Sequence, residues 1–216
     1  MQDLQERERI GVMSRVCIID YGSGNQASVY NIFRSLTENV SISKDPAELD
    51  AATHIVLPGV GAFGAVMEKL SESGVIDSMT ENVLGRKKPF LGICVGMQIL
   101  AGKGTEHGEC AGLGWIKGTV RKMDEKGGLR LPHIGWNNFE RMSPCAVLDG
   151  IAPDVDYYFV NSYYFDAEDA GSVAATYMYG KEYTAAVMRD NIFGVQFHPE
   201  KSQKAGKMLL ENFLNI

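Results

Sequence analysis

Hydrophobic and polar positions along the first hundred residues predict strands and helices in alternation. Short apolar runs typical of strands occupy residues 16–19, 40–43, 54–57 and 89–93. Between them, apolar residues recur every third or fourth position, the period of a helix with one buried face. Alternating strands and helices predict an α/β fold with a parallel sheet covered on both faces. The two clearest stripes are Val29, Ile32, Phe33, Leu36 and Phe63, Val66, Met67, Leu70.

From about residue 115 the pattern is dominated by strands. Asp190-Asn191 separates the last two strand-like runs and predicts a hairpin turn. The chain closes with a helical stripe of Ala205, Met208, Leu209 and Phe213. No linker or repeat interrupts the pattern, so we expect one domain over residues 14–216, with a mixed, mostly parallel sheet flanked by helices. The strand-like runs are 118–123, 131–139, 157–164, 173–177, 185–189 and 192–197.

Composition supports a globular chain and narrows its class. Of 216 residues, 45% are hydrophobic and 22% charged, and the net charge of −6 argues against a nucleic-acid-binding surface. No apolar run approaches the about 18–20 residues that span a bilayer. The polar residues 1–13 do not resemble a signal peptide, and we expect a disordered extension there. Four cysteines without an export signal favour a reduced, cytoplasmic protein.

A candidate nucleophile lies in the segment Gly92-Ile93-Cys94-Val95-Gly96. A predicted strand precedes it and a predicted helix follows, which is the context of a nucleophile elbow with cysteine in place of serine. Flanking glycines relieve crowding at such a turn, and the helix N-terminus favours a thiolate. The alternative is a buried structural cysteine between ordinary glycines.

A candidate base follows the last strand, in Gln196-Phe197-His198-Pro199-Glu200. In extended backbone Glu200 would lie on the same side as His198, orient one ring nitrogen and leave the other for the thiol. A surface histidine beside a glutamate is the alternative. The other histidines, His54, His107 and His133, are expected to be structural. His107 and Cys110 have metal-like spacing without a second pair, so no metal site is expected.

Acyl transfer also requires donors for an oxyanion. Pro58-Gly59-Val60-Gly61 follows a predicted strand and offers backbone N–H groups that no bulky side chain shields. The N–H of Val95, directly after the nucleophile, is the natural second donor. A tight strand-to-helix turn would explain the same residues, and both interpretations can hold.

Together, residues 58–61, 92–98 and 198–200 resemble the class-I, triad-type glutamine amidotransferases, and the resemblance spans residues 15–216. Residues 20–25, 131–137 and 196–202 resemble more closely the glutaminase subunits of imidazole glycerol phosphate synthases in histidine biosynthesis. The resemblance implies a flavodoxin-like fold and no cofactor. It also implies hydrolysis of glutamine and delivery of ammonia to a (β/α)8-barrel cyclase subunit in a heterodimer.

The resemblance implies a role for each matching residue. Cys94 would attack the glutamine amide, His198 would move the proton, and Glu200 would orient His198. The implied oxyanion hole comprises Gly59, Val60 and Val95. The implied glutamine pocket comprises Gly61, Gln98, Glu106, Asn161 and Ser162, although Glu106 could equally be a solvated loop charge. The implied cyclase-facing residues are Asn25, Trp136, Asn137 and Lys201, for which a turn, a core position and a solvated surface are the alternatives.

Asn161 departs from the family pattern, which usually has histidine there. Asparagine keeps hydrogen-bonding capacity and cannot carry a positive charge. The departure leaves open a related glutaminase that supplies another synthase, such as a system that amidates cell-surface sugars. A cysteine hydrolase of another kind and a non-catalytic binding module are further alternatives. The specific motifs argue against the hydrolase, and the intact Cys94, His198 and Glu200 argue against the binding module.

Overall fold

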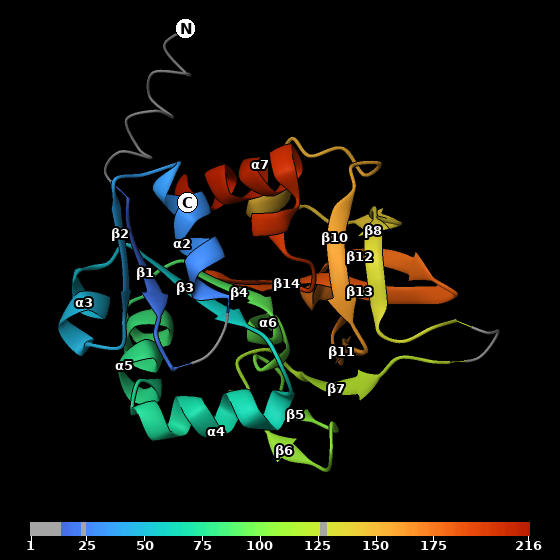
Figure 1. The fold of residues 1–216 in the computed structure, drawn as a ribbon, viewed down its shortest axis with the longest axis horizontal. Helices are drawn as coiled ribbons and strands as arrows, with labels where there is room; N and C mark the ends of the chain where they lie inside the picture. Colours follow the sequence, from blue (N-terminus) through green and yellow to red (C-terminus); the bar gives the residue numbers. More distant parts are fainter. Residues whose placement is uncertain (1–13, 23–24, 126–128) are drawn as a thin grey trace, which may run out of the picture.

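The computed structural model describes residues 14–22, 25–125 and 129–216 (Figure 1). Residues 1–13, where we expected an extension, lie outside the described residues. The central element is an eight-stranded sheet in the order β2-β1-β3-β4-β14-β13-β12-β9. Its strands are β1 (Arg15–Ile19), β2 (Asn39–Ser43), β3 (His54–Gly59), β4 (Phe90–Cys94), β9 (Arg141–Met142), β12 (Val173–Tyr179), β13 (Lys181–Arg189) and β14 (Ile192–Val195).

The half of the sheet from β2 to β14 is parallel, and the other half is antiparallel. Every residue of β3, β4 and β14 is buried, as expected for strands covered on both faces. Figure 1 shows α2 and α7 on one side and α4, α5 and α6 on the other. The α/β class and mixed, mostly parallel sheet are confirmed. The helices are α2 (Gln26–Arg34), α3 (Pro46–Ala51), α4 (Phe63–Ser73), α5 (Ile76–Thr80), α6 (Val95–Gln98) and α7 (Gln203–Leu214).

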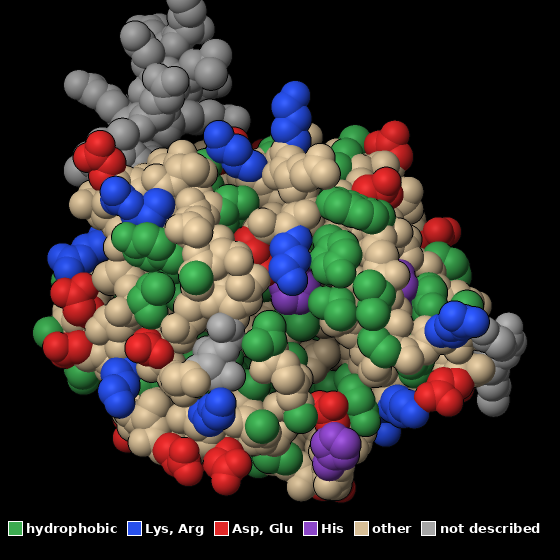
Figure 2. Space-filling model, viewed as in Figure 1, with side chains coloured by type: hydrophobic (Ala, Val, Ile, Leu, Met, Phe, Trp, Pro, Cys, Tyr) green, Lys and Arg blue, Asp and Glu red, His purple; other side chains and the backbone are tan. Residues whose placement is uncertain are grey.

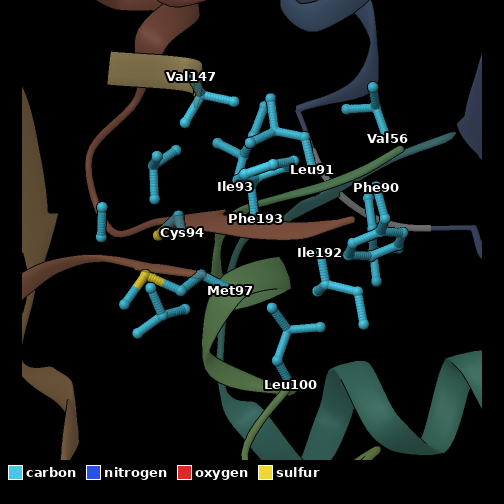
Figure 3. Packing of buried hydrophobic residues seen from close by; sticks show 14 of the residues in the cluster. Val56, Phe90, Leu91, Ile93, Cys94, Met97, Leu100, Val147, Ile192 and Phe193 are labelled. Carbon is cyan, nitrogen blue, oxygen red and sulfur yellow. The ribbon is translucent and has the colours of Figure 1, made fainter. Parts of the chain in front are cut away.

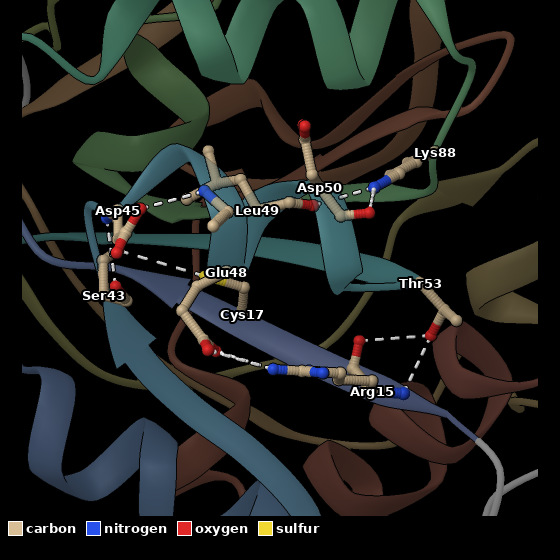
Figure 4. Close-up of polar contacts among 10 residues, drawn as sticks. Arg15, Cys17, Ser43, Asp45, Glu48, Leu49, Asp50, Thr53 and Lys88 are labelled. Carbon is tan, nitrogen blue, oxygen red and sulfur yellow. Dashed lines mark hydrogen bonds and ion pairs between the residues drawn. The ribbon is translucent and has the colours of Figure 1, made fainter.

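Polar contacts cap α3 and link it to β1 (Figure 4). Asp45 caps the helix by accepting a hydrogen bond from the Ala47 N–H at 2.9 Å. The Arg15 guanidinium pairs with Glu48 at 2.9 Å and links β1 to α3. Because both side chains are more than one-third exposed, this pair contributes little to stability.

The second half of the chain adds two small sheets that the sequence pattern did not distinguish from the main one. One pairs β8 (His133–Asn137) with β10 (Tyr157–Asn161), and the other has the order β11-β7-β5-β6. The run 157–164 was expected to be one strand, and it splits at Ser162 because the two parts pair with different strands. The second sheet contains β5 (Lys103–Gly104), β6 (Cys110–Ala111), β7 (Gly118–Lys122) and β11 (Tyr163–Ala167).

The last hairpin agrees with the sequence prediction, and the buried face of the last helix differs from it. The Asp190-Asn191 hairpin is confirmed, since Arg189 pairs with Ile192 and Asp190 adopts a φ of 52°. Met208 was expected on the buried stripe of the last helix and is instead 38% exposed. The contact surface of α7 is narrower than the periodicity indicates and centres on Leu209, Leu210 and Phe213.

Candidate active site

Cys94 occupies a strained turn where β4 ends and α6 begins. Its backbone has φ 56° and ψ −113°, a region that side chains other than glycine rarely adopt, and its side chain is buried. The two flanking glycines permit close packing around the turn. A Cβ on Gly96 would lie 1.9 Å from the Leu57 carbonyl oxygen, and one on Gly92 would lie 2.5 Å from the Gly96 oxygen. Figure 3 shows Cys94 and Met97 among the packed side chains of β4, α6 and β14.

His198 and Glu200 form a buried pair just beyond β14. His198 Nδ1 lies 2.7 Å from Glu200 Oε1, and both side chains are almost fully buried. The expectation that extended backbone aligns them is wrong, because Pro199–Lys201 forms a 3-10 turn that brings Glu200 back to the ring. His198 Nε2 is buried and makes no hydrogen bond within the described residues.

Opposing influences act on the His198 imidazole. Burial lowers its pKa, while the neighbouring Cys94 sulfur and Glu200 carboxylate raise it, and the net effect is a pKa raised to about 9. The carboxylate bonded to Nδ1 leaves Nε2 for exchange of a proton with the sulfur. The structure therefore brings Cys94, His198 and Glu200 together from segments about a hundred residues apart.

Asn25, which the resemblance implies to face a cyclase, also contacts the triad. It directly precedes α2, and its Nδ2 donates a hydrogen bond to Glu200 Oε1 at 3.0 Å. The same oxygen also accepts from His198, while Oε2 is buried without a partner among the described residues. Asn25 thus holds the carboxylate that orients the histidine.

Cys94 and His198 open into one cavity of about 370 Å³. All five residues implied for the glutamine pocket line it, as do Val60, Val95 and Lys201. Gly59 does not line the cavity. Its backbone packs on the elbow, where a Cβ would lie 2.5 Å from the Gly96 nitrogen. The full lining is Val60, Gly61, Cys94, Val95, Gln98, Glu106, Pro132, Val160, Asn161, Ser162, Tyr163, His198 and Lys201.

The loop of residues 58–61 is held by a hydrogen bond at its first residue and is exposed beyond it. The Tyr21 hydroxyl donates a hydrogen bond to the Pro58 carbonyl oxygen at 2.8 Å. Beyond it, Val60 is 38% exposed and Gly61 has a φ of 98°, which favours glycine. Val95 is the first residue of α6, so its N–H has no partner within the helix. The arrangement can supply backbone donors beside Cys94.

Glu106 brings a carboxylate to the cavity wall. Its Oε2 accepts a hydrogen bond at 2.8 Å from the Phe63 N–H, the first residue of α4. No side chain of the preceding residue caps that helix, so Glu106 takes this role from a distant loop. An anchored negative charge in the cavity suits an ammonium group of a ligand.

A chain of side-chain amides, which the sequence interpretation did not assign, lies behind the sulfur. Gln98 Nε2 donates to the Tyr163 carbonyl at 3.1 Å and to Gln196 Oε1 at 3.0 Å. Gln196 Nε2 in turn donates to Cys94 Sγ at 3.7 Å. Gln98 and Gln196 are 98 residues apart, so no local pattern in the sequence indicates this contact.

Asn161 lies in the cavity wall and is buried. Its Nδ2 donates to the Tyr163 carbonyl at 3.0 Å and to the Tyr177 hydroxyl at 3.1 Å. Its Oδ1 is buried without a hydrogen-bond partner among the described residues. Asn161 therefore shares the Tyr163 carbonyl with Gln98 and is linked through it to the amide chain.

The remaining histidines lie outside the cavity. His133 is buried against the Tyr179 ring, with centroids 4.1 Å apart, and burial lowers its pKa. His54 packs edge-on against Phe213, and burial lowers its pKa to about 4. In the described part of the chain no cluster of histidine, cysteine or carboxylate side chains could hold a metal ion.

Of the residues implied to face a cyclase, Lys201 lines the cavity, and Trp136 and Asn137 belong to β8. Trp136 is 49% exposed and packs edge-on against Tyr158, and Lys201 lies 5.6 Å from the same ring. Asn137 donates a hydrogen bond to the Met178 carbonyl and so stabilises β8 against β12. Figure 2 shows hydrophobic side chains gathered on this face, over β8 and β10.

Comparison with known proteins gives consistent matches. The family model of class-I glutamine amidotransferases matches residues 17–216. A relative in Campylobacter jejuni (strain RM1221), named imidazole glycerol phosphate synthase subunit HisH 1, is 43% identical over 93% of this chain and 100% of its own length. The HisH subunit of Leptospira interrogans is 45% identical over 92% and 98%, and HisH 2 of Pseudomonas aeruginosa is 40% identical over 93% and 99%.

Solved structures show the same fold at lower identity. The structure of PurLQS from Thermotoga maritima superposes with a TM-score of 0.71 at 20% identity and covers 94% of this chain and 98% of the other. A structure described as a glutamine amidotransferase superposes equally well, with a TM-score of 0.71 at 18% identity over 92% and 97% of the two chains. The chain belongs to the class-I glutamine amidotransferase family and is an enzyme of the glutaminase-subunit type.

Proposed function

We propose that this chain hydrolyses L-glutamine to glutamate and ammonia through a Cys94–His198–Glu200 triad. The observation that carries the proposal is a strained, buried cysteine that shares a cavity with a buried histidine–carboxylate pair. Such an arrangement activates a thiol for attack on a carbonyl carbon. No cofactor is needed for this reaction, because every proton is moved by side chains or water.

The reaction proceeds in two balanced halves. In the first, His198 takes the Cys94 proton, and Sγ bonds to the side-chain amide carbon of glutamine. The oxyanion that forms is stabilised by the N–H groups of Val95 and of the loop at Gly59 and Val60. His198 then gives the proton to the leaving nitrogen, which departs as ammonia and leaves a γ-glutamyl thioester on Cys94.

In the second half, water replaces the sulfur. His198 removes a proton from the water, and the resulting hydroxide attacks the thioester carbon. The carbon–sulfur bond breaks, the proton returns to Sγ, and glutamate leaves. Glu106 suits the α-ammonium group of the substrate. Gln98 would offer that group its Oε1, because both Nε2 hydrogens of Gln98 are already donated to Tyr163 and Gln196.

The partner we propose is a (β/α)8-barrel cyclase subunit of an imidazole glycerol phosphate synthase, bound as a heterodimer in the cytoplasm. The names of the relatives support it, and so does the exposed apolar surface of Ile134 and Trp136 beside the cavity. Ammonia released into water becomes protonated and loses its nucleophilicity. Direct transfer to a docked partner avoids that loss.

A second candidate keeps the glutaminase and changes the acceptor. Asn161 favours it, since this buried wall residue departs from the family histidine. A partner from another pathway, such as one that amidates cell-surface sugars, would then consume the ammonia.

One reconstitution separates the two candidates. The chain is mixed with the cyclase subunit and its phosphoribosyl nucleotide substrate, and glutamate and cyclised product are measured together. Equal amounts of the two support the histidine pathway. Glutamate release without product, in a complex that cyclises when given ammonium salt, excludes that pathway for this chain. Cys94→Ala in the same complex serves as the control, since it should lose glutamine-dependent and keep ammonia-dependent synthesis.

A further inference from the structure

The geometry points to Gln196 as a hydrogen-bond donor that stabilises the negative charge on Cys94 Sγ, with Gln98 as the residue that fixes its orientation. The inference rests on the proposed function and assigns a further residue to the same reaction. Gln196 has no exposed surface, and its Nε2 lies 3.7 Å from the sulfur.

The orientation of the Gln196 amide follows from its neighbours. The Tyr163 carbonyl can only accept a hydrogen bond, so the Gln98 group that faces it must be the NH2. The second hydrogen of that group points to Gln196, which must present its oxygen there. The Gln196 NH2 is thereby turned toward Cys94. The Tyr163 carbonyl thus determines the orientation of both the Gln98 and the Gln196 amide groups.

Gln196 and His198 approach the sulfur from the same segment. They are two residues apart after β14, and the Gln196 N–H is fixed to the Ala185 carbonyl at 2.8 Å. His198 exchanges the proton, while Gln196 can only donate a hydrogen bond and carries no charge. A neutral donor supports the thiolate without competing for the proton, and it also supports the sulfur as leaving group when the thioester is hydrolysed.

The hydrogen-bonded chain of side-chain amides also reaches the cavity wall. The Tyr163 carbonyl accepts from both Gln98 and Asn161, and all three residues line the cavity. A glutamine molecule that moves Gln98 or Asn161 would therefore change how firmly the Gln196 donor is held. This is a direct physical link between occupancy of the pocket and the state of the nucleophile.

The test is the pH dependence of alkylation of Cys94 by iodoacetamide in the full-length chain, followed by peptide mass spectrometry. Gln196→Met keeps the shape and removes the donor, and Gln196→Glu replaces the donor by an acceptor. Both variants should move the midpoint of the rate profile to higher pH, by about one unit or more, with about a tenfold lower rate at neutral pH. Gln98→Met should shift it in the same direction and less far.

Asn212→Leu is the matched control, because it removes another amide that donates two hydrogen bonds, outside the cavity. It should leave the alkylation profile unchanged. A wild-type profile in folded Gln196→Met or Gln196→Glu overturns the inference. Failure of the proposed function is a different result, namely glutamine hydrolysis that survives loss of the Cys94 thiol.

Discussion

Replacement of Glu200 by glutamine isolates the effect of charge on the triad. Oε1 of Glu200 accepts hydrogen bonds from His198 Nδ1 at 2.7 Å and from Asn25 Nδ2 at 3.0 Å. In Glu200→Gln the amide oxygen can keep both bonds, and the NH2 group takes the place of Oε2, which has no partner among the described residues. The substitution therefore keeps the geometry and removes the negative charge.

The magnitude follows from the difference between charged and neutral hydrogen bonds. Loss of charge assistance at His198 is worth about 1 to 2 kcal/mol, equivalent to about a 5- to 30-fold fall in kcat. The free energy of unfolding should change by less than about 1 kcal/mol, since one unpartnered group replaces another. The Glu200 carboxylate raises the pKa of His198, so its removal lowers that pKa. Because His198 acts as a base once it has lost its proton, the acidic limb of the kcat profile should move to lower pH.

The assay is steady-state release of glutamate by the complex with its synthase subunit, measured across pH, with urea unfolding in parallel. Glu182→Gln is the matched control, because Glu182 pairs with Arg141 and Thr176 outside the cavity. It should leave kcat unchanged. A folded Glu200→Gln variant with a kcat within about twofold of wild type and an unshifted pH profile would show that the charge of Glu200 does not assist His198.

Three further predictions concern packing, acid stability and the partner. Gly96→Ala should lower the free energy of unfolding, measured with urea, by about 3 kcal/mol or more, because the new Cβ would lie 1.9 Å from the Leu57 carbonyl oxygen. Gly102→Ala is the control and should lower it by less than about 1 kcal/mol, because the nearest atom to its Cβ is 3.6 Å away. Burial lowers the pKa of His54 to about 4, because the buried ring is held in its neutral form. The contribution of His54 to the free energy of unfolding is therefore fully present above pH 6.5 and is lost as pH falls toward 4. Between pH 7 and pH 5 the free energy of unfolding of wild type should fall by about 2 kcal/mol more than that of His54→Leu. Equal falls in the two proteins would contradict the lowered pKa of His54. His107→Asn, at an exposed histidine, is the control and should behave like wild type. The isolated chain should hydrolyse glutamine slowly and gain on the order of 100-fold in kcat with its partner, because the exposed loop at Val60 and Gly61 can reorient its N–H groups toward the oxyanion when the partner binds. A high rate of glutamine hydrolysis without the partner would contradict this prediction.

The sequence predicted the parallel half of the fold well, because buried parallel strands produce continuous apolar runs. The run 54–57 and the run 89–93 correspond closely to β3 and β4. The antiparallel half was harder, since an apolar run does not reveal its partner strand. The split at Ser162 depends on pairing of β10 with β8 and of β11 with β7, which are contacts distant in sequence.

In the candidate site, too, residues with a local sequence pattern were predicted, and contacts between distant segments were not. Cys94 and His198 were predicted because the residues around each carry a local pattern. Asn25 was expected at an interface, and its contact with Glu200 spans 175 positions in the sequence, so no local pattern could indicate it. The link from Gln98 through Gln196 to the sulfur was missed for the same reason.

Covalent capture of glutamine on residue 94 would show whether Cys94 is the nucleophile. The complex with its synthase subunit is mixed with glutamine, quenched in acid during turnover and analysed by peptide mass spectrometry, alongside Cys94→Ala. We expect a γ-glutamyl adduct on the Cys94 peptide, no adduct in the variant, and loss of glutamine hydrolysis in a variant that remains folded. Sustained release of glutamate by folded Cys94→Ala would contradict this role of Cys94.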